Sequence, residues 1–586
     1  MDQRKADEDW KSQGGPLPEQ HDFVEPAPVP DPSADHVDLT TDTGSPQAAD
    51  PTPPPPPVES AAKGVKETVE SILIAFILAF VFRAFVVEAF VIPTGSMAPT
   101  LAGAHMRWTC RECGYTFDVG WERPATTGDT DPPAFAGPDT SGKNKVYSPS
   151  CQNCKFPVDP ADATNPPIRY GDRILVLKYL YIPWISSPRR WDVVVFKTPD
   201  TPQGEAPYVV NYIKRLVGLP REQVMVLDGD VYARSDDDAK KVKELGDPLY
   251  GWQIQPKPRY AQDAMWRLVF DNDYRPLHNE RETDNWHYPW VADGGAGWDR
   301  GERTMSKDLA FDNLTGGGGL KFDFKADRSG RYGTDWLSYN DPHGQYHGQY
   351  AVSDFRLRFF YDRREGDGPL KARLTKHGQE FEIELTKDGA RLTHRVPRRA
   401  DVTIPPAESF KPADASGPVQ VEFSIADYQV IVRLNDRVIF QTTSDQYAPD
   451  VTDLLRRYGP QPTESEYDRA RVSISAERQR AVLSHVSLWR DVYYTPPRLH
   501  GAPPRGIELG AGEYFVMGDN SDRSSDARMW TRKIDLPDED LKVEDGRVPE
   551  RFMLGRAFFV YWPAGYKPFK GSPSVVPNFG EMRMIR

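Results

Sequence analysis

A single apolar run, SILIAFILAFVFRAFVVEAFVI at residues 71–92, constrains the fold of this chain more than any other feature. Its first twelve residues carry no charge, and Arg83 and Glu88 then interrupt it. A membrane-spanning helix needs about 20 predominantly apolar residues. We therefore predict a transmembrane anchor at 63–92 that begins its apolar part near Val69, with the Arg83 side chain extending toward the bilayer surface.

The rest of the chain is polar, which excludes a protein with many membrane spans. Hydrophobic residues make up 38% of the 586 residues, and the mean hydropathy is −0.62. This length predicts about two to four domains. The net charge of −13 is opposite to the basic footprint of a nucleic-acid-binding protein. Lys63 and Lys66 precede the apolar run and favour an N-terminus inside the cell, with the remaining chain outside.

Composition and alternation divide the chain further. Residues 1–62 are acidic and proline-rich, so they cannot bury enough apolar surface to fold and are predicted to be disordered. Alternating strand-like runs fill 168–234 and return at 499–586. Between them, residues 235–498 carry alternating runs of their own, and Asn435-Asp436 separates two of these as a hairpin turn. We expect a mainly β protein in which 235–498 is an inserted β-sandwich.

Two segments carry residue types suited to hydrolysis. VIPTGSMAPTL at 91–101 places Ser96 among prolines and a glycine, which favour a tight, non-regular turn. YVVNYIKRLVGLP contains Lys214, and strand periodicity places Lys214 on one face with Tyr212 and Leu216. Burial of that face would lower the pKa of the Lys214 amine, as a general base near neutral pH requires.

A third segment, GDNSDRSSDARMW at 518–530, combines turn formers with hydroxyl and carboxylate groups. By itself it also suits a calcium-binding or capping loop. Taken in order, however, the three segments resemble the boxes of the type I signal peptidase family. PTGSMAPT (93–100) is similar to its serine box, YIKRLVGLPRE (212–222) to its lysine box, and GDNSDRSSDAR (518–528) to its C-terminal box. Thr94 stands where the family has serine, and Arg221-Glu222 replaces the usual Gly-Asp.

The resemblance covers less than a third of the chain and implies a signal-peptidase-type β core built from residues 93–109, 168–234 and 499–586. Ser96 would be the nucleophile and Lys214 its general base. The backbone N–H of Ser96 and the hydroxyl of Thr94 would form the oxyanion hole. The C-terminal box would support them: Ser524 by a hydrogen bond to the Lys214 amine, Asp526 and Arg528 by pairing, and Gly518, Asp519 and Asn520 by shaping the turn.

The same resemblance implies a function. It is that of a membrane-bound bacterial serine endopeptidase that removes signal peptides from exported precursor proteins. Cleavage would follow small residues at the outer face of the cytoplasmic membrane and would need no cofactor. Precursors and the lipid bilayer would be its partners, and nucleic acid would not. Two alternatives stay open: a Ser/Lys protease that trims other membrane substrates, and an inactive anchored protein that binds partners.

Four cysteines form two C-x-x-C pairs, Cys110 with Cys113 and Cys151 with Cys154, which 37 residues separate. The segment 110–160 resembles a zinc ribbon, in which four thiolates close a tetrahedral structural site. Two disulfides are the competing interpretation, because the domain is expected in an oxidising compartment. Zinc is favoured, since a disulfide within each C-x-x-C pair would be strained.

The stretch 235–498 resembles concanavalin-like or laminin-G-like sandwiches, chiefly through YQVIVRLNDRVIFQ and VSLWRDVYY. Such folds bind glycans, bind proteins or act as scaffolds, so the resemblance does not fix a role. We expect a spacer or docking module, with a glycan or a protein as its possible ligand.

Overall fold

The computed structural model describes residues 61–121, 147–158, 166, 168–178, 181, 186–199, 210–301, 306–408, 410, 417–458, 469–536, 541–563 and 578–586. The tail predicted to be disordered at 1–62 lies outside these residues, apart from Ala61 and Ala62, which begin a helix. The stretch 122–146, between the two cysteine pairs, also lies outside them. The described chain is mainly β, which confirms that part of the predicted fold class.

Helix α2 (Ala61–Phe85) contains the first two thirds of the apolar run. Its large side chains are exposed: Leu78 by 62% and Phe80 by 67%. The helix ends earlier than the predicted anchor, because Val87–Val91 forms strand β1 and pairs antiparallel with β4 (Arg173–Leu177). Within the described part of the chain, no helix combines the length and the apolar character needed to cross a membrane. The spanning anchor predicted at 63–92 is therefore unsupported.

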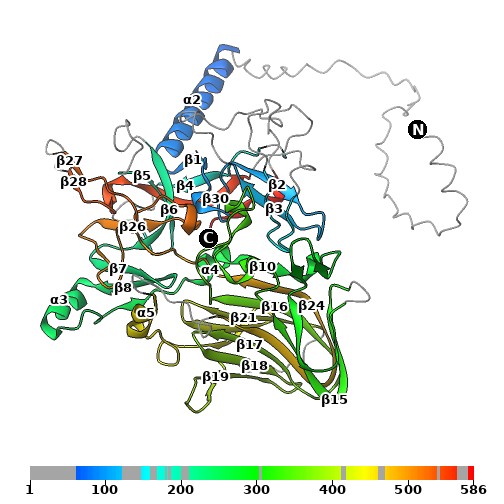
Figure 1. Ribbon diagram of the computed structural model, residues 1–586. Helices are drawn as coiled ribbons and strands as arrows, with labels where there is room; N and C mark the ends of the chain where they lie inside the picture. The colour runs from blue at the N-terminus through cyan, green and yellow to red at the C-terminus, as the bar shows by residue number, and fades with distance from the viewer. Residues whose placement is uncertain are drawn as a thin grey trace, which may run out of the picture. The chain divides into compact units, whose positions relative to one another are not determined.

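The core sheet has eight strands and joins distant parts of the sequence, as the upper part of Figure 1 shows. Its order is β1, β4, β30 (Met553–Trp562), β5 (Val193–Lys197), β6 (Asn211–Gly218), β26 (Glu513–Met517) and β29 (Val548–Pro549), with β31 (Arg583–Met584) paired to β30. Strand β6 lies between β5 and β26, so both of its edges are hydrogen-bonded. A residue in the middle of β6 is consequently held in a fixed position.

A second sheet has four strands, three of which follow β6 in the chain and one of which precedes β26. Their order in the sheet is β25 (Ile507–Glu508), β7 (Glu222–Leu227), β8 (Asp230–Ser235) and β9 (Gln253–Ile254). The turn between β7 and β8 is Asp228-Gly229, with φ of 52° and 83°. Positive φ at both positions is typical of a two-residue hairpin turn, and Asp-Gly is a preferred pair there.

The large sheet has thirteen strands and occupies the lower part of Figure 1. Its longest strand, β24 (Val472–Arg490), pairs with β10, β15, β16 and β17. The predicted turn at Asn435-Asp436 is present between β22 and β23, again with positive φ. The other strands are β10 (Arg267–Asp271), β13 (Trp290–Gly295), β14 (Trp298–Asp299), β15 (Leu309–Phe322), β16 (Phe355–Gly366), β17 (Leu370–Lys376), β18 (Gln379–Leu385), β19 (Ala390–Arg395), β20 (Val402–Ile404), β21 (Val419–Ala426), β22 (Gln429–Leu434) and β23 (Arg437–Gln441).

The remaining elements are short. They are the helices α3 (Asp236–Leu245), α4 (Arg259–Met265) and α5 (Val451–Tyr458), and the strand pairs β2 (His105–Thr109) with β3 (Thr116–Gly120), β11 (Glu280–Arg281) with β12 (Trp286–His287), and β27 (Ile534–Leu536) with β28 (Leu541–Val543). Helix α3 shows why such pieces form. Ser235 caps its first turn by accepting a hydrogen bond from the Asp238 N–H, and Gly246 ends it in the left-handed conformation.

Candidate active site

Ser96 and Lys214 meet although 118 positions separate them in the sequence. Ser96 lies in η2 (Gly95–Met97), a single 3₁₀ turn that follows β1, and Lys214 lies in the middle of β6. The Lys214 Nζ donates to the Ser96 Oγ at 2.7 Å. Both side chains are buried, with 9% of Ser96 and 4% of Lys214 exposed.

The surroundings of Lys214 favour its neutral amine. Burial lowers the pKa of the Lys214 amine to about 8, although the carboxylates of Asp526 and Asp519 act in the opposite direction. The face of the Tyr212 ring, whose centroid lies 5.3 Å from Nζ, also favours the charged amine, so burial is what lowers the pKa. A neutral amine within hydrogen-bond distance of a serine hydroxyl can accept its proton, which is the arrangement of an activated nucleophile.

The turn that carries Ser96 is anchored by apolar side chains. Met97 and Leu101 are fully buried in a cluster with side chains of β4 and β5. The Ala98 N–H donates to the Gly95 carbonyl at 3.0 Å, and the Leu101 N–H donates to the Met97 carbonyl at 2.9 Å. These contacts fix the backbone on both sides of the serine.

The 518–528 loop closes over this turn. A Cβ on Gly518 would lie 2.4 Å from the Ser96 carbonyl oxygen, so the close approach requires glycine here. The Asn520 N–H donates to that same oxygen at 3.0 Å, and the Asn520 side-chain amide donates to the Gly95 carbonyl at 2.9 Å. The loop is thus hydrogen-bonded to the backbone of the proposed nucleophile.

Two buried ion pairs hold the loop. Asp519 pairs with Arg215 of β6 at 2.6 and 2.7 Å, and neither side chain is exposed to solvent. Asp526 pairs with Arg528 at 2.7 and 2.8 Å. Although burial alone would raise the pKa of both carboxyl groups, the partner guanidinium holds each pKa below its usual range. Arg215 directly follows Lys214, but the sequence pattern alone does not predict its role in holding the loop.

One predicted contact is absent from the structure. Ser524 does not form the predicted hydrogen bond with Lys214: its side chain is buried against Gly518 and helps to lower the pKa of the Asp526 carboxyl group. Thr94 precedes the 3₁₀ turn, is exposed, and makes no side-chain capping bond. Ser524 lies directly after the short turn Ser521–Arg523.

The four cysteines lie together. Cys110 and Cys113 flank the turn between β2 and β3, and Cys151 and Cys154 form a second turn of the same kind. In each, the residue after the second cysteine donates its N–H to the first cysteine's carbonyl, at 2.9 and 3.0 Å. The Sγ atoms of Cys110 and Cys154 are 3.6 Å apart, and those of Cys113 and Cys151 are 3.7 Å apart. Four sulfurs tetrahedrally placed about 2.3 Å from zinc would be about 3.8 Å apart, so this donor set fits zinc and not a disulfide, whose sulfurs lie about 2 Å apart.

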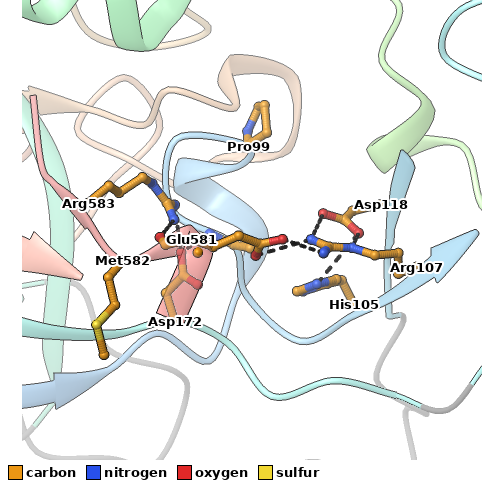
Figure 2. Close-up of a pocket in the computed structure, with 10 residues that line it drawn as sticks. Pro99, His105, Arg107, Asp118, Asp172, Glu581, Met582 and Arg583 are labelled. Carbon is orange, nitrogen blue, oxygen red and sulfur yellow. Dashed lines mark hydrogen bonds and ion pairs between the residues drawn. The ribbon is translucent and has the colours of Figure 1, made fainter. Parts of the chain in front are cut away.

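A cavity of about 270 Å³ lies near the end of the Ser96 turn, but it does not hold the Ser96–Lys214 pair. Pro99, His105, Arg107 and Glu581 are among its lining residues, and Figure 2 shows Arg107 between Asp118 and Glu581. Its charged groups are therefore largely paired with one another.

Parts of the chain are similar to a known protein family. The family model described as "Signal peptidase, peptidase S26" matches residues 65–119, 154–249 and 462–562. Signal peptidase I of Pseudomonas aeruginosa is 38% identical over 85 residues, covering 14% of this chain and 26% of the relative. Signal peptidase I of Pseudomonas fluorescens is 34% identical over 91 residues, covering 15% and 28%. The chain thus spans about a quarter of the length of the curated relatives it matches.

Among solved structures, a carbohydrate-binding module from Bacillus subtilis is similar to part of the chain. It is 11% identical, covers 34% of this chain and 94% of its own length, and has a TM-score of 0.20. The three matched family segments, by contrast, contain Ser96, Lys214 and the 518–528 loop respectively. This chain is therefore similar to the signal peptidase family, peptidase S26, over these three segments, which together make up less than half of its length.

Proposed function

We propose that the protein is a serine endopeptidase that removes signal peptides from precursor proteins by a Ser/Lys dyad. The observation that carries the proposal is the 2.7 Å contact between the Lys214 Nζ and the Ser96 Oγ in a buried site. The similarity to the signal peptidase family model and to curated signal peptidases supports the reaction class.

In the proposed mechanism, neutral Lys214 takes the proton of Ser96 as its Oγ attacks the scissile carbonyl carbon. The resulting ester links the substrate's acyl group to Ser96, and the lysine ammonium returns the proton to the leaving amine. Water, deprotonated by Lys214, then hydrolyses the ester. The Ser96 N–H and the Thr94 hydroxyl are the proposed donors to the developing oxyanion, each worth about 3–4 kcal/mol in such sites. The exposed position of Thr94 leaves its hydroxyl accessible to substrate.

The dyad is tested with purified protein and a precursor that carries a signal peptide. Ser96→Ala and Lys214→Ala are each expected to reduce cleavage at least about 10³-fold, because removing either member removes the activated nucleophile. Lys197→Ala is the matched control, since Lys197 is exposed on the neighbouring strand β5. Cleavage by both dyad variants at the parent rate would refute the assignment. Cleavage of other membrane proteins, but never of a precursor, would favour the alternative substrate class.

We further propose that helix α2 associates with the lipid bilayer and that cleavage occurs at the outer face of the cell membrane. The proposal is supported by the exposed apolar side chains of α2, which lipid would cover. Replacing Leu78 and Phe80 by aspartate should release the protein from sedimented vesicles, whereas replacing the exposed Lys240 and Lys241 of α3 should not. Equal vesicle binding by all variants would contradict the proposal.

Finally, we propose that the four cysteines hold a structural zinc ion. The sulfur spacing and the paired turns support it. With four thiolates occupied the ion has no open position and would stabilise the fold without taking part in catalysis. Metal analysis of purified protein should give about one zinc per chain, and its absence together with lost free thiols would favour disulfides.

A further inference from the structure

One short turn of the large sheet reaches the proposed active site. The turn η6 (Ser338–Asn340) lies between β15 and β16, outside the three segments that match the family. All three of its side chains are buried. This buried turn therefore comes from a part of the chain that the family model does not match.

Asn340 and Asn520 form a closed amide pair. The Asn340 amide donates to the Asn520 Oδ1 at 2.7 Å, and the Asn520 amide donates back to the Asn340 Oδ1 at 2.8 Å. The second hydrogen of the Asn520 amide goes to the Gly95 carbonyl, and its backbone N–H goes to the Ser96 carbonyl. Asn340 thus fixes the orientation of the side chain that holds the residues at and before the proposed nucleophile.

Tyr339 packs on the same turn from another direction. A Cβ on Gly95 would lie 2.4 Å from the Tyr339 ring, and a Cβ on Gly120 would lie 2.9 Å from it. The ring is only 6% exposed and clusters with Ala98 and Leu337. Glycine at position 95 is therefore what allows the aromatic ring to lie against the Ser96 turn.

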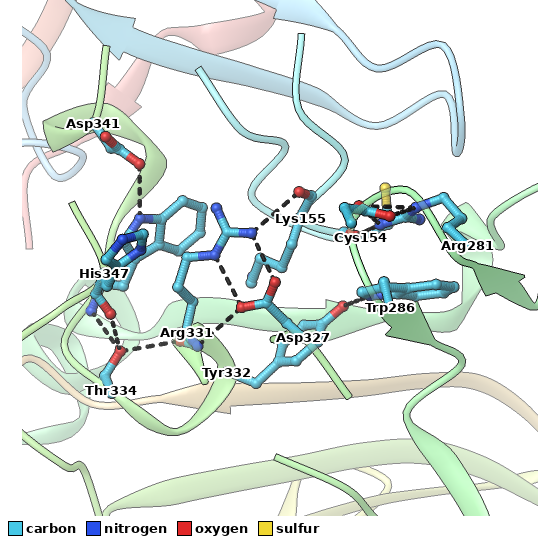
Figure 3. Close-up of polar contacts among 12 residues, drawn as sticks. Cys154, Lys155, Arg281, Trp286, Asp327, Arg331, Tyr332, Thr334, Asp341 and His347 are labelled. Atoms are coloured by element: carbon cyan, nitrogen blue, oxygen red, sulfur yellow. Dashed lines mark hydrogen bonds and ion pairs between the residues drawn. The ribbon is translucent and has the colours of Figure 1, made fainter. Parts of the chain in front are cut away.

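The turn η6 also contacts residues beside Cys151, in the second cysteine turn. The Ser338 N–H donates to the Gln152 side-chain oxygen, and the Ser338 hydroxyl donates to the Ser150 carbonyl, both at 2.8 Å. Figure 3 shows the adjoining contacts, in which Arg331 pairs with Asp327 and donates to the Lys155 carbonyl. Buried polar contacts therefore join the turn η6 to the second cysteine turn through Ser338 and to Asn520 through Asn340.

We propose that Asn340 is a positioning residue of the active site, supplied by the large sheet, which acts on Ser96 through Asn520. The expected effect on catalysis rests on the proposed peptidase function, whereas the expected effect on the position of the Ser96 turn does not. Under this proposal the large sheet contributes to catalysis without binding a ligand.

The kinetic test compares Asn340→Ala, Asn520→Ala and the double variant in precursor cleavage. Each single variant is expected to lower kcat about 10- to 100-fold with little change in KM, because the nucleophile shifts while substrate contacts remain. The double variant should be no slower than the slower single one, since the two amides act as a unit. Asn313→Ala, in strand β15 of the same sheet, is the control. Parent-like kcat in Asn340→Ala, or multiplicative losses in the double variant, would overturn the proposal.

A second readout does not depend on activity. Hydrogen exchange of the peptide segments around 93–101 and 518–524 reports the bonds to the Gly95 and Ser96 carbonyls. Asn340→Ala should speed exchange there about tenfold or more and leave β5 unchanged. If the parent cleaves no precursor but this protection is still lost, the function fails and the positioning role stands. If protection is unchanged, or is lost equally throughout the protein, the positioning role fails.

Discussion

The buried position of Lys214 makes a quantitative prediction about pH. With a pKa of about 8 in place of the ordinary 10.5, the neutral fraction of the amine at pH 7 rises from about 0.03% to about 9%, a gain of about 300-fold. Between pH 7 and pH 9 the neutral fraction increases about tenfold further. If neutral Lys214 is the base, kcat/KM should follow this curve, because kcat/KM reports the pKa of the free enzyme.

The assay measures kcat/KM for a peptide spanning a signal-peptide cleavage site from pH 6 to pH 10. We expect a tenfold rise per pH unit that levels off near pH 8. Any residual activity of Lys214→Ala should lack this limb, which separates titration of Lys214 from titration of the substrate. A flat profile in the parent, or a rise that continues to about pH 10.5, would refute the reasoning from burial.

Three further predictions concern stability. Because burial lowers the pKa of Lys214, the charged amine costs stability fully below pH 8, and that cost disappears as the pH rises from 8 to 10.5. Lys214→Met should therefore raise the free energy of unfolding by up to about 3 kcal/mol at pH 7, a gain that shrinks as the pH rises above 8 and is lost by about pH 10.5. Chemical denaturation that shows no gain at pH 7 contradicts this. Asp519→Ala leaves the buried Arg215 uncompensated and should lower the free energy of unfolding by about 3–5 kcal/mol, whereas Arg480→Ala, at an exposed pair, should change it little. Removing zinc with a chelator should lower Tm, and adding zinc should restore it; an unchanged Tm would argue against the metal site.

The Ser96 and Lys214 pair could be predicted because short local motifs carry it. The proline and glycine around Ser96 predict a turn, and the β6 pattern predicts a lysine on an apolar face. The end of the apolar helix could not be predicted in the same way. Residues 87–91 are apolar enough for either structure, and only pairing with β4 decides for a strand.

Asn340 shows where prediction from the sequence ends. It lies in a 3₁₀ turn between two strands, with no motif or periodicity to mark it. Its contact with Asn520 spans 180 positions and exists only because the large sheet and the core sheet pack together. Ser524 shows the converse: the family motif suggests a hydrogen bond to the Lys214 amine, which the structure does not contain.

The central claim, that Ser96 is a nucleophile activated by Lys214, is tested most directly by trapping the covalent intermediate. Purified protein is mixed with an activated ester of a signal-peptide segment, quenched in acid, digested and analysed by mass spectrometry. We expect the peptide containing Ser96 to carry the acyl group in the parent, and Ser96→Ala and Lys214→Ala to carry none. Acylation at another residue, or equal acylation of Ser96 in Lys214→Ala, would contradict it.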